Sequence, residues 1–581
     1  MKKYIFMALV ASAGLALTGC NDFLDDNRFP LTEIINTPEY WSNPSNVQLQ
    51  VDRFTDELSQ GYGTDQNGWF YFKTLNDDQV GSSFANWAYP TIPSTATSDW
   101  DFSVVRGTNY VIEGVESSSL TAAEKANFIG IARMVRGYTY YNLVRKYGDV
   151  TWVDHVVDVT EDDILYGART KRDEVMDNVL ADLQYAVQNI SADDSKTTWS
   201  KDYARAILSE VALYEGTFCR YRTQADNGYA PDEERAKKYL AISAEASEYL
   251  LGKYGFCDDY QSIYNSTWTG DTNAGITALS TNPELIVGRR YDQVNGRNGI
   301  IAYTCSSTTT RGLSLDGFNA FLFKDGKPRA LTSLDNSLVG EPTTFEGQPA
   351  LSIQKLLDVR EARLSIITDP YVYYKGMEWS RAGAAGMTSS SGFGVAKFDN
   401  IKFPVNQRNQ TGQNYTSCPL YWTSYIACNY AEAKAELGQF GQAEFNKSIK
   451  KLYERAGLGQ IITGPEYLAN LNDPDNNMGV SSLLWEVRRV RRCELMFDNW
   501  IRYWDLVRWH QLELLDSQKH PDVLRGAYVA NAPVSCTDMD AQGYVRPYSN
   551  LNRVYAAKYY LYPIPSSQLN LNENLGQNPN W

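Results

Sequence analysis

The sequence has very few of the residues on which metal-dependent and acid–base catalysis depend. Its 581 residues include only three histidines, and these are too dispersed to predict a metal site: His155, His510 and His520. The HExxH, GxSxG, Walker A and GxGxxG motifs are absent. Carboxylate pairs are plentiful in so acidic a chain, so a glycosidase dyad stays open as an alternative. The sequence therefore predicts a protein that is not an enzyme and that has neither a metal nor a cofactor.

Long apolar runs, clustered cysteines and an excess of positive charge are also missing. Beyond Leu17 no apolar run approaches the ~20 residues that span a bilayer. The eight cysteines are scattered without a CxxC pair, which argues against structural zinc and a disulfide framework, although one or two disulfides stay open. Lys and Arg number 54 against 69 Asp and Glu, so the net charge is −15. So acidic a body is not expected to bind nucleic acid, because that binding depends on neutralising phosphates.

The N-terminus reads as an export signal. Lys2 and Lys3 give a basic start, and the apolar run from Ile5 to Leu17 is too short to span a membrane. Leu-Thr-Gly-Cys at positions 17–20 resembles a bacterial lipobox, in which cleavage leaves Cys20 first and its sulfur carries lipid. The alternative is an ordinary signal peptide that happens to precede a cysteine. We predict a signal peptide at 1–19 and lipidation of Cys20, which gains about 0.8 kcal/mol for each CH2 buried in the membrane.

An acidic tether at residues 20–36 follows the lipidated cysteine. It carries Asp22, Asp25 and Asp26 close behind Cys20. Composition alone indicates only a solvated linker. An acidic stretch at this place, however, resembles the surface-export signal of some Gram-negative lipoproteins. We therefore expect a lipid-anchored protein of the outer membrane that faces the exterior.

Helical periodicity dominates residues 37–256. A helical patch at Val47–Leu58 precedes mixed sequence, and from Thr121 apolar residues recur at helical spacing until Gly148 ends the first long helix. Three further stripes follow, starting near Val175, Tyr203 and Pro231. The spacing is loosely that of helix-turn-helix repeats, which bury their apolar faces against neighbouring repeats. An irregular helical bundle is the runner-up.

Residues 257–419 have little helical signal. They are rich in Gly, Ser, Thr, Asn and aromatic residues, contain turn signals such as Asn295-Gly296, and show one short helical piece near Ile353–Leu364. An irregular stretch this long inside a compact body is usually functional or disordered, and its many aromatic residues argue against disorder. We predict a loop-rich ligand-binding region with little β structure.

Helices return in residues 420–581. Stripes at Trp422–Leu437 and Phe445–Ala456 each end at a glycine, and longer helices are expected near Leu483–Met496 and Tyr503–Leu515. The segment Tyr559–Pro565 is expected to start as a strand and end in turns.

The predicted helix at Leu483–Met496 is rich in arginine. Arg488, Arg489, Arg491 and Arg492 alternate with large apolar residues and carboxylates. We predict arginines buried in ion pairs with carboxylates such as Glu486 and Asp498, rather than a basic binding surface.

Five stretches along the chain carry a family resemblance. They are Cys20–Asp25, Ala132–Val150 with its Gly-Asp-Val turn, Asn429–Lys434 followed by Glu454–Leu458, Arg491–Trp509, and Pro563–Pro565 followed by Gln577–Pro579. In this order they resemble the start, first repeat, last repeat, C-terminal signature and closing motif of the SusD/RagB family of outer-membrane nutrient-binding lipoproteins. One departure is Phe497-Asp498-Asn499, where the family commonly has Phe-Glu-Gly.

The resemblance implies a mainly α fold on a tetratricopeptide-like helical repeat scaffold. It also implies a SusC-like TonB-dependent transporter as partner, over which the lipoprotein sits as a lid. Family members bind oligosaccharides or, in some branches, peptides, and do not cleave them. We expect an oligosaccharide- or polysaccharide-binding protein that delivers its ligand to this transporter. The alternatives are peptide uptake by the same scaffold and a surface glycoside hydrolase.

In this family the ligand surface comes from loops near the N-terminus and from the central irregular stretch. A sugar site needs aromatic faces for the apolar side of the ring and amide or carboxylate partners for its hydroxyls. The candidates chosen on position and chemistry are Asp78, Asn86, Trp87, Tyr89, Trp268, Arg290, Tyr291, Tyr303 and Trp379. Each of the aromatic residues has core packing as its alternative role.

Overall fold

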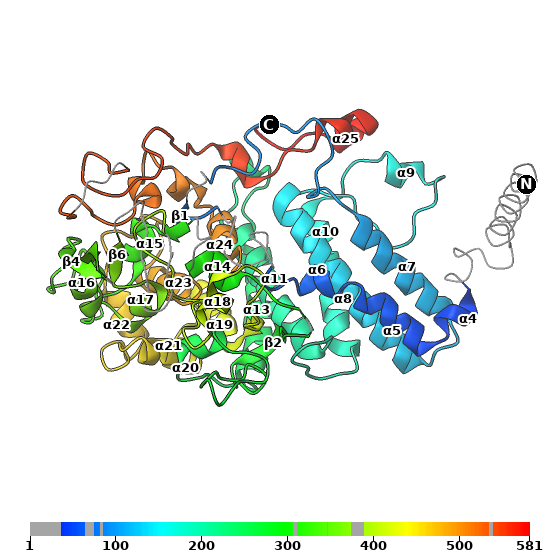
Figure 1. The fold of residues 1–581 in the computed structure, drawn as a ribbon. Helices are drawn as coiled ribbons and strands as arrows, with labels where there is room; N and C mark the ends of the chain where they lie inside the picture. The colour runs from blue at the N-terminus through cyan, green and yellow to red at the C-terminus, as the bar shows by residue number, and fades with distance from the viewer. Residues whose placement is uncertain are drawn as a thin grey trace, which may run out of the picture.

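The computed structural model describes residues 37–63, 75–81, 85–294, 296–305, 311–345, 347–373, 389–533 and 538–581. In this part the chain is mainly helical, which confirms the expected fold class. The N-terminal helices lie at one end of the molecule and the loop-rich stretch at the other, while the end of the chain returns over the N-terminal helices (Figure 1). Among the helices described, none is both long enough and apolar enough to cross a membrane.

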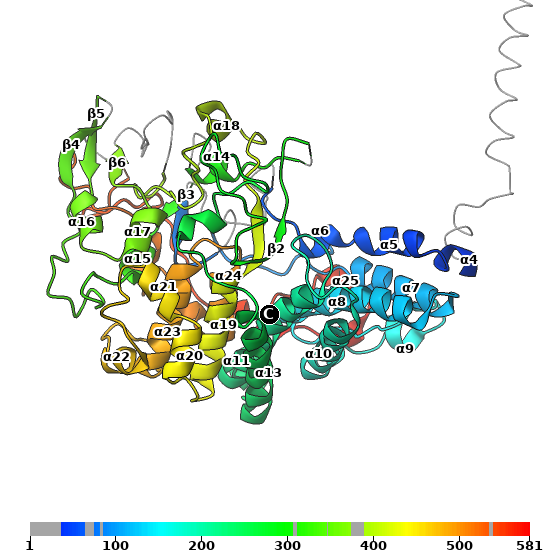
Figure 2. The same ribbon diagram turned by 90° about the horizontal axis from the view of Figure 1, so that it is seen from below.

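The N-terminal half is a row of packed helices. Its long members are α8 (Ala122–Tyr147), α10 (Arg172–Asn189), α11 (Lys201–Tyr221) and α13 (Glu233–Leu251). α10 packs on α8, and α11 packs on both α10 and α13 (Figure 2). Thr121 and Glu124 form a capping box that starts α8, and Gly148 ends it with φ of +72°. The predicted repeat helices and their stop signals are thereby confirmed.

The N-terminal half also contains shorter helices. They are α4 (Pro38–Trp41), α5 (Pro44–Asp52), α6 (Thr55–Leu58), α7 (Ser103–Ser117), α9 (Asp162–Leu165) and α12 (Gln224–Asn227). Trp41 is 1% exposed and lies on Gly114 of α7, where an added Cβ would come within 2.2 Å of the indole ring. Glycine at 114 thus lets the first helix dock closely on α7.

The C-terminal helices continue the row. α19 (Thr423–Glu436) packs on α13, and α23 (Ser482–Glu494) packs on α19. The expected helix at Phe445–Ala456 is instead two, α20 (Gln442–Lys447) and α21 (Lys450–Arg455), because Ser448 leaves the helical conformation at φ −116° and ψ −87°. The other short helices of this half are α22 (Pro465–Asn470), α24 (Ile501–Arg508), α25 (Ser566–Leu571), η2 (Leu512–Leu515), η3 (Pro521–Leu524), η4 (Ala557–Tyr560) and η5 (Glu573–Leu575).

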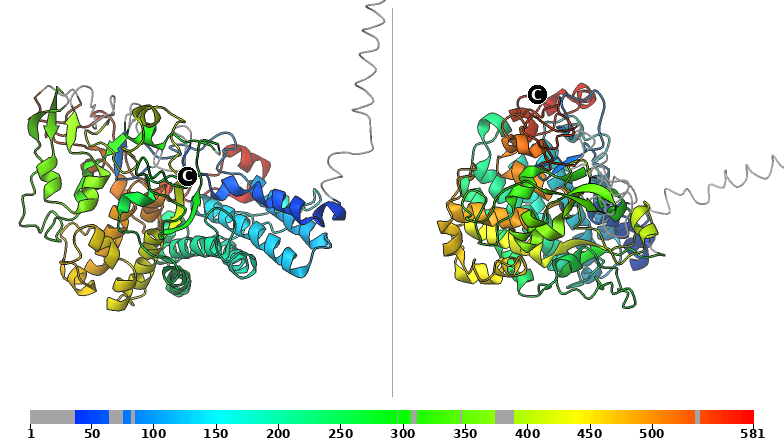
Figure 3. Two further views of the ribbon diagram at one scale, coloured as in Figure 1. Left: turned by 60° about the horizontal axis from the view of Figure 1, so that its bottom comes forward. Right: turned by 60° about the vertical axis from the view of Figure 1, so that its left-hand side comes forward.

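The central stretch contains small antiparallel sheets and short helices. β2 (Leu285–Arg289) pairs with β7 (Cys418–Trp422), β1 (Gln79–Gly81) pairs with β3 (Arg311–Leu313), and β5 (Gln348–Ser352) lies between β4 (Glu341–Phe345) and β6 (Tyr371–Tyr373). The helices here are η1 (Tyr260–Ile263), α14 (Ile300–Cys305), α15 (Leu315–Ala320), α16 (Gln354–Asp358), α17 (Ala362–Ile367) and α18 (Val405–Asn409). In the left view of Figure 3 this stretch lies beside the C-terminal helices, away from the first repeat.

Two local expectations near the C-terminus are corrected or explained by the backbone. The expected strand at Tyr559 is the 3-10 helix η4, because the segment meets the end of α8 rather than a strand edge, and the Tyr562 amide donates to the Lys146 carbonyl.

Asn499, which replaces the family glycine between α23 and α24, has φ of +47°. Asparagine is among the few residues that adopt this left-handed conformation readily, so the turn survives the substitution.

The arginines of α23 are buried in ion pairs, as predicted. Arg491 donates to Asp505 at 2.8 Å and Arg489 donates to Glu486 at 2.9 Å. Asp498, expected as a partner of these arginines, instead accepts from the fully buried Lys397 at 2.7 Å. The chain turns away from α23 after Leu495, which directs Asp498 toward the central stretch.

A further buried pair joins α24 to α19. Both guanidinium Nη atoms of Arg508 donate to the Glu432 carboxylate, at 2.5 and 2.6 Å, and the Trp509 indole donates to it at 2.6 Å. Burial alone would raise the pKa of Glu432, but Arg508 outweighs burial and lowers that pKa to about 2. The ionised carboxylate therefore stabilises the fold.

We expect Glu432→Gln to lower the free energy of unfolding by about 3 kcal/mol near neutral pH. Because the folded pKa lies below the unfolded one, this contribution is complete above about pH 5 and is lost as pH falls toward about 2. Urea denaturation at several pH values measures it. The control is Glu513→Gln, which removes an exposed ion pair to Lys519 and should cost less than about 1 kcal/mol. If the loss of unfolding free energy caused by Glu432→Gln grew as the pH fell, Glu432 would not be an ionised, stabilising carboxylate.

Candidate functional site

A depression of about 750 Å³ lies on the loop-rich side of the molecule. Two chain segments, residues 267–272 and 290–294, form most of its lining, and Tyr415 completes it. Three of the residues predicted from sequence lie here together: Trp268, Arg290 and Tyr291. The depression is therefore the cavity that brings together three of the candidate ligand-binding residues.

The first segment is a compact loop that holds Trp268. A bridge joins Thr267 to Ala278, and a second bridge joins Asp271 to Ile276. The Asp271 carboxylate caps the turn by accepting from the backbone amides of Asn273 and Ala274, at 3.0 and 3.1 Å. Trp268 is half-buried and packs against the hydrophobic core, so its ring is held in place while part of it stays accessible.

The second segment continues from strand β2. Tyr291 is 5% exposed, stacks on Tyr62 with 6.4 Å between ring centroids, and donates its hydroxyl to the Tyr62 carbonyl at 2.5 Å. Burial raises the pKa of Tyr291 well above its ordinary value, so the phenol is neutral and acts as a donor. Tyr291 thus supplies a rigid wall, with its polar end already engaged.

The rim of the depression is polar. Arg290 is exposed and lies 2.7 Å from the Asp292 carboxylate, and Thr269, Thr272 and Gln293 are exposed beside it. A half-buried aromatic face surrounded by planar donors and acceptors suits a ligand with an apolar ring face and hydroxyl edges. The arrangement is suited to binding such a ligand by contact.

The first-loop candidates lie apart from this depression. The Trp87 indole is 5% exposed, stacks on Tyr559 with 4.3 Å between centroids, and donates to the Val554 carbonyl at 2.8 Å. Tyr89 donates its hydroxyl to Asp99 at 2.5 Å. Asn86 is exposed, and its side-chain oxygen accepts from the Trp87 amide.

The remaining candidates are dispersed. Asp78 is 1% exposed and accepts from Arg492 at 2.7 Å, deep beneath β1. Burial raises the pKa of Asp78, although Arg492 opposes the shift. Tyr303 is half-buried on α14 and packs against the core. Trp379 and Cys20 lie outside the described residues.

Sequence reasoning missed Tyr415 and the polar rim residues Asp271 and Gln293. Tyr415 lies more than a hundred positions beyond Trp268, and the pairing of Arg289 with Cys418 across β2 and β7 brings it to the depression. That pairing has no signal in local periodicity. Asp271 was detectable, because Asp followed by Thr-Asn-Ala-Gly is a turn signal.

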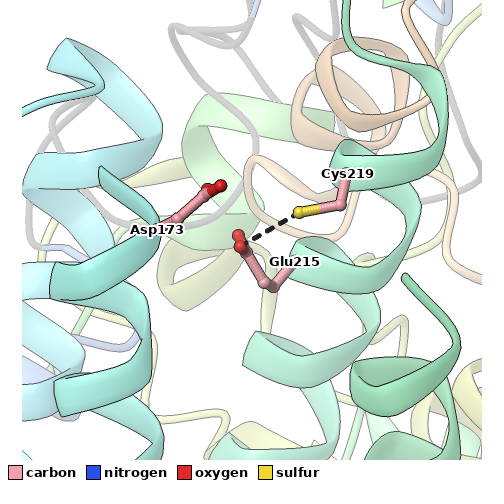
Figure 4. Close-up of side chains that lie close together, drawn as sticks. All are labelled: Asp173, Glu215 and Cys219. Atoms are coloured by element: carbon pink, nitrogen blue, oxygen red, sulfur yellow. Dashed lines mark hydrogen bonds between the residues drawn. The ribbon is translucent and has the colours of Figure 1, made fainter. Parts of the chain in front are cut away.

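One cluster in the helical half has the residue types of a metal site. Figure 4 shows Asp173, Glu215 and Cys219 pointing toward one another, with Cys219 hydrogen bonded to Glu215. The Glu215 carboxylate accepts from Arg172 at 2.5 Å and also from Arg235. The Asp173 carboxylate accepts from Arg222. Burial raises the pKa of the Cys219 thiol well above its usual range. Three cations and a neutral thiol do not suit a metal ion, which requires thiolate and unpaired carboxylate ligands.

Comparison with protein-family models gives two matches. A model described as "SusD family" matches residues 283–581, slightly more than half of the chain. A second model, described as "Starch-binding associating with outer membrane", matches residues 94–213.

Curated relatives match parts of the chain or most of it. A "SusD-like protein" of Bacteroides ovatus is 27% identical over 266 residues, which are 42% of this chain and 44% of that protein. The match thus spans less than half of that relative. "SusD-like protein P38" of Formosa agariphila is 24% identical over 527 residues, which are 87% of this chain and 92% of that protein.

Solved structures match the fold over nearly the whole chain. A "SusD-like carbohydrate binding protein" from Bacteroides fragilis has a TM-score of 0.63 at 19% identity and covers 92% of this chain and 100% of that one. The structure titled "B. fragilis NanU" has a TM-score of 0.55 at 16% identity, covering 94% and 98%. At these identities the likeness establishes the fold.

The two tryptophan environments predict different costs of truncation. Trp87→Ala removes a buried ring with a stacked partner and a hydrogen bond, so we expect it to lower the free energy of unfolding by about 3–5 kcal/mol. Trp268→Ala removes a half-buried ring and should cost about 1–2 kcal/mol. Chemical denaturation of both variants measures the difference. Equal losses would mean that Trp268 is as much a core residue as Trp87.

Proposed function

The chain belongs to the SusD family, and on this premise we propose that it binds oligosaccharides or polysaccharides at the depression lined by Trp268, Arg290 and Tyr291. The observation that carries the proposal is the half-buried Trp268 ring held beside a polar rim. A pyranose ring packs its CH face on such a surface and directs its hydroxyls to the rim. Asn86, the exposed member of the first-loop candidates, is a further polar contact for a long glycan.

We further propose that the protein is an outer-membrane lipoprotein anchored at Cys20 and facing the exterior. The support is the lipobox-like sequence, the acidic tether behind it, and the matched family model whose description includes association with the outer membrane. A lipid anchor keeps the body at high effective concentration near any partner in the same membrane. The partner we propose is a SusC-like TonB-dependent transporter, to which the bound glycan is delivered.

The proposed role is binding without cleavage. A glycosidase needs two carboxyl groups on opposite sides of a glycosidic bond, one of them protonated. In the depression, Asp271 is engaged in capping its own turn and Asp292 is paired with Arg290. Neither is placed as an unengaged acid, which favours capture of the glycan intact.

Affinity electrophoresis of the mature protein in gels containing a panel of neutral polysaccharides tests this function. We expect at least one polysaccharide to retard the protein, and Trp268→Ala to weaken that binding about 10-fold or more. Tyr166→Ala is the matched control, because Tyr166 is 54% exposed and lies beyond α9, outside the depression.

Three outcomes would count against the proposal in different ways. Full retardation of Trp268→Ala would move the site elsewhere on the same protein. Capture of peptides with no retardation by any polysaccharide would favour peptide uptake by the same scaffold. Release of reducing sugars from a bound polysaccharide by the purified protein would favour a hydrolase.

A further inference from the structure

A second pocket, of about 430 Å³, lies where the helical repeats meet the C-terminal helices. It shares no lining residue with the depression at Trp268. Its walls come from α8, α11, β7, α19 and α24, elements that converge near the middle of the molecule in Figure 2. The exposed residues Glu57, Gln60 and Ala88 line it too and mark the side on which it opens.

Each helix contributes one face to this pocket. On α8 the lining residues Tyr138, Tyr141, Asn142 and Arg145 follow helical spacing, so they share a face. On α11 the lining includes Tyr214. On α24 the lining residues Ile501, Trp504, Asp505 and Arg508 also follow helical spacing. The other aromatic residues of the lining are Tyr421, Trp422, Tyr425, Trp500 and Tyr562. Nine of the 25 lining residues are therefore aromatic, and they come from every wall of the pocket.

Apart from Glu57, which is exposed at the opening, the charged residues that line the pocket form ion pairs. Lys146 lies 2.7 Å from Asp99, and Arg508 lies 2.7 Å from Asp505. The Arg145 guanidinium lies 4.0 Å from Glu210 and stacks over the Trp504 ring at 4.3 Å. An ionic ligand would have to compete with these pairs, so the pocket favours a neutral one.

Five buried polar atoms of the lining lack a hydrogen-bond partner among the residues that the structure describes. They are the side-chain oxygens of Asn142 and Asn499, the Nε of Arg145, the indole nitrogen of Trp422 and the hydroxyl of Tyr214. Tyr214 is 3% exposed, and burial raises its pKa well above the ordinary value, so its hydroxyl keeps its proton. A purely apolar ligand would leave these atoms unpaired, at the cost of their desolvation.

We propose that this pocket binds a neutral saccharide of one or two rings. Sugar rings pack their CH faces on the aromatic rings of the lining, and their hydroxyls are donors and acceptors that pair with the five polar atoms. The volume is at the lower end of the range of small-molecule sites, which suits a short saccharide rather than the interior of a polymer. This proposal does not rest on the proposed function, because the two sites have different lining residues.

The test is calorimetric titration of the mature protein carrying Trp268→Ala, so that the depression contributes little. The probes are neutral mono- and disaccharides of the common hexoses and N-acetylhexosamines, with glucuronate as a charged probe and indole as an apolar one. We expect at least one neutral saccharide to bind with one-to-one stoichiometry. Adding Tyr214→Phe, which removes only the unpaired hydroxyl, should weaken that binding about 5- to 10-fold.

Tyr203→Phe is the matched control on the same helix. Tyr203 is 1% exposed, and its hydroxyl already donates to the Leu58 carbonyl at 2.8 Å, outside the pocket. It should lower thermal stability and leave saccharide affinity unchanged. A crystal structure with the bound saccharide between α8 and α24 would support the assignment directly.

Several results would overturn the proposal. These are the absence of binding by every neutral saccharide of the panel, tighter binding of glucuronate or indole than of any neutral sugar, and equal affinity of the Tyr214→Phe and unmodified proteins. Failure here and failure of the polysaccharide assay are distinguishable. Tyr214→Phe should leave polysaccharide retardation intact in a protein with native Trp268, and Trp268→Ala should leave the small-saccharide affinity intact.

Discussion

Buried pairing of arginine with carboxylate holds together segments that lie far apart in the sequence. Arg502 donates to Asp77 at 2.8 and 2.6 Å, and Arg492 donates to Asp316 at 2.6 Å, so α23 and α24 bind both the N-terminal loop and the central stretch. Burial alone would raise the pKa of Asp77, but Arg492 and Arg502 lower it below its usual range. Removing one partner of such a pair costs about 3–5 kcal/mol, because the other charge is left buried and unpaired. The pairs therefore specify which segments meet.

The same pairing fixes the ribbon on which both candidate sites are built. Glu284 is fully buried directly before β2 and accepts from Arg455 at 3.0 Å, which ties α21 to the start of the strand. β2 continues into Arg290 and Tyr291 of the depression, while its partner β7 presents Tyr421 to the second pocket. A two-stranded ribbon has little stability alone, so its position depends on these ion pairs and on the surrounding core.

Features that depend on residues close together in the sequence could be predicted, and features that depend on distant residues could not. The repeat helices were predictable because their signals are local: the apolar stripes and Gly148 lie within α8 and its cap. The burial of the α23 arginines was predictable from the apolar residues between them, but the partner of Asp498 was not. Trp87 shows the limit most clearly, since its stacked partner Tyr559 lies more than four hundred residues away. Composition alone does not distinguish a ring that packs from a ring that binds.

Burying arginines also shapes the outer surface. Arg172, Arg363 and Arg408 are among the largest fully buried side chains, and each is paired with a buried or half-buried carboxylate. Each such pair removes one charge of each sign from the exterior, so the net charge of −15 is spread over fewer exposed groups. An acidic surface repels anionic polymers and exerts no long-range attraction on neutral ones. At physiological ionic strength salt also screens its field beyond about 8 Å. If the ligand is the neutral glycan that we propose, its recognition comes from short-range contact, and a half-buried tryptophan beside an arginine already paired with Asp292 offers such contact.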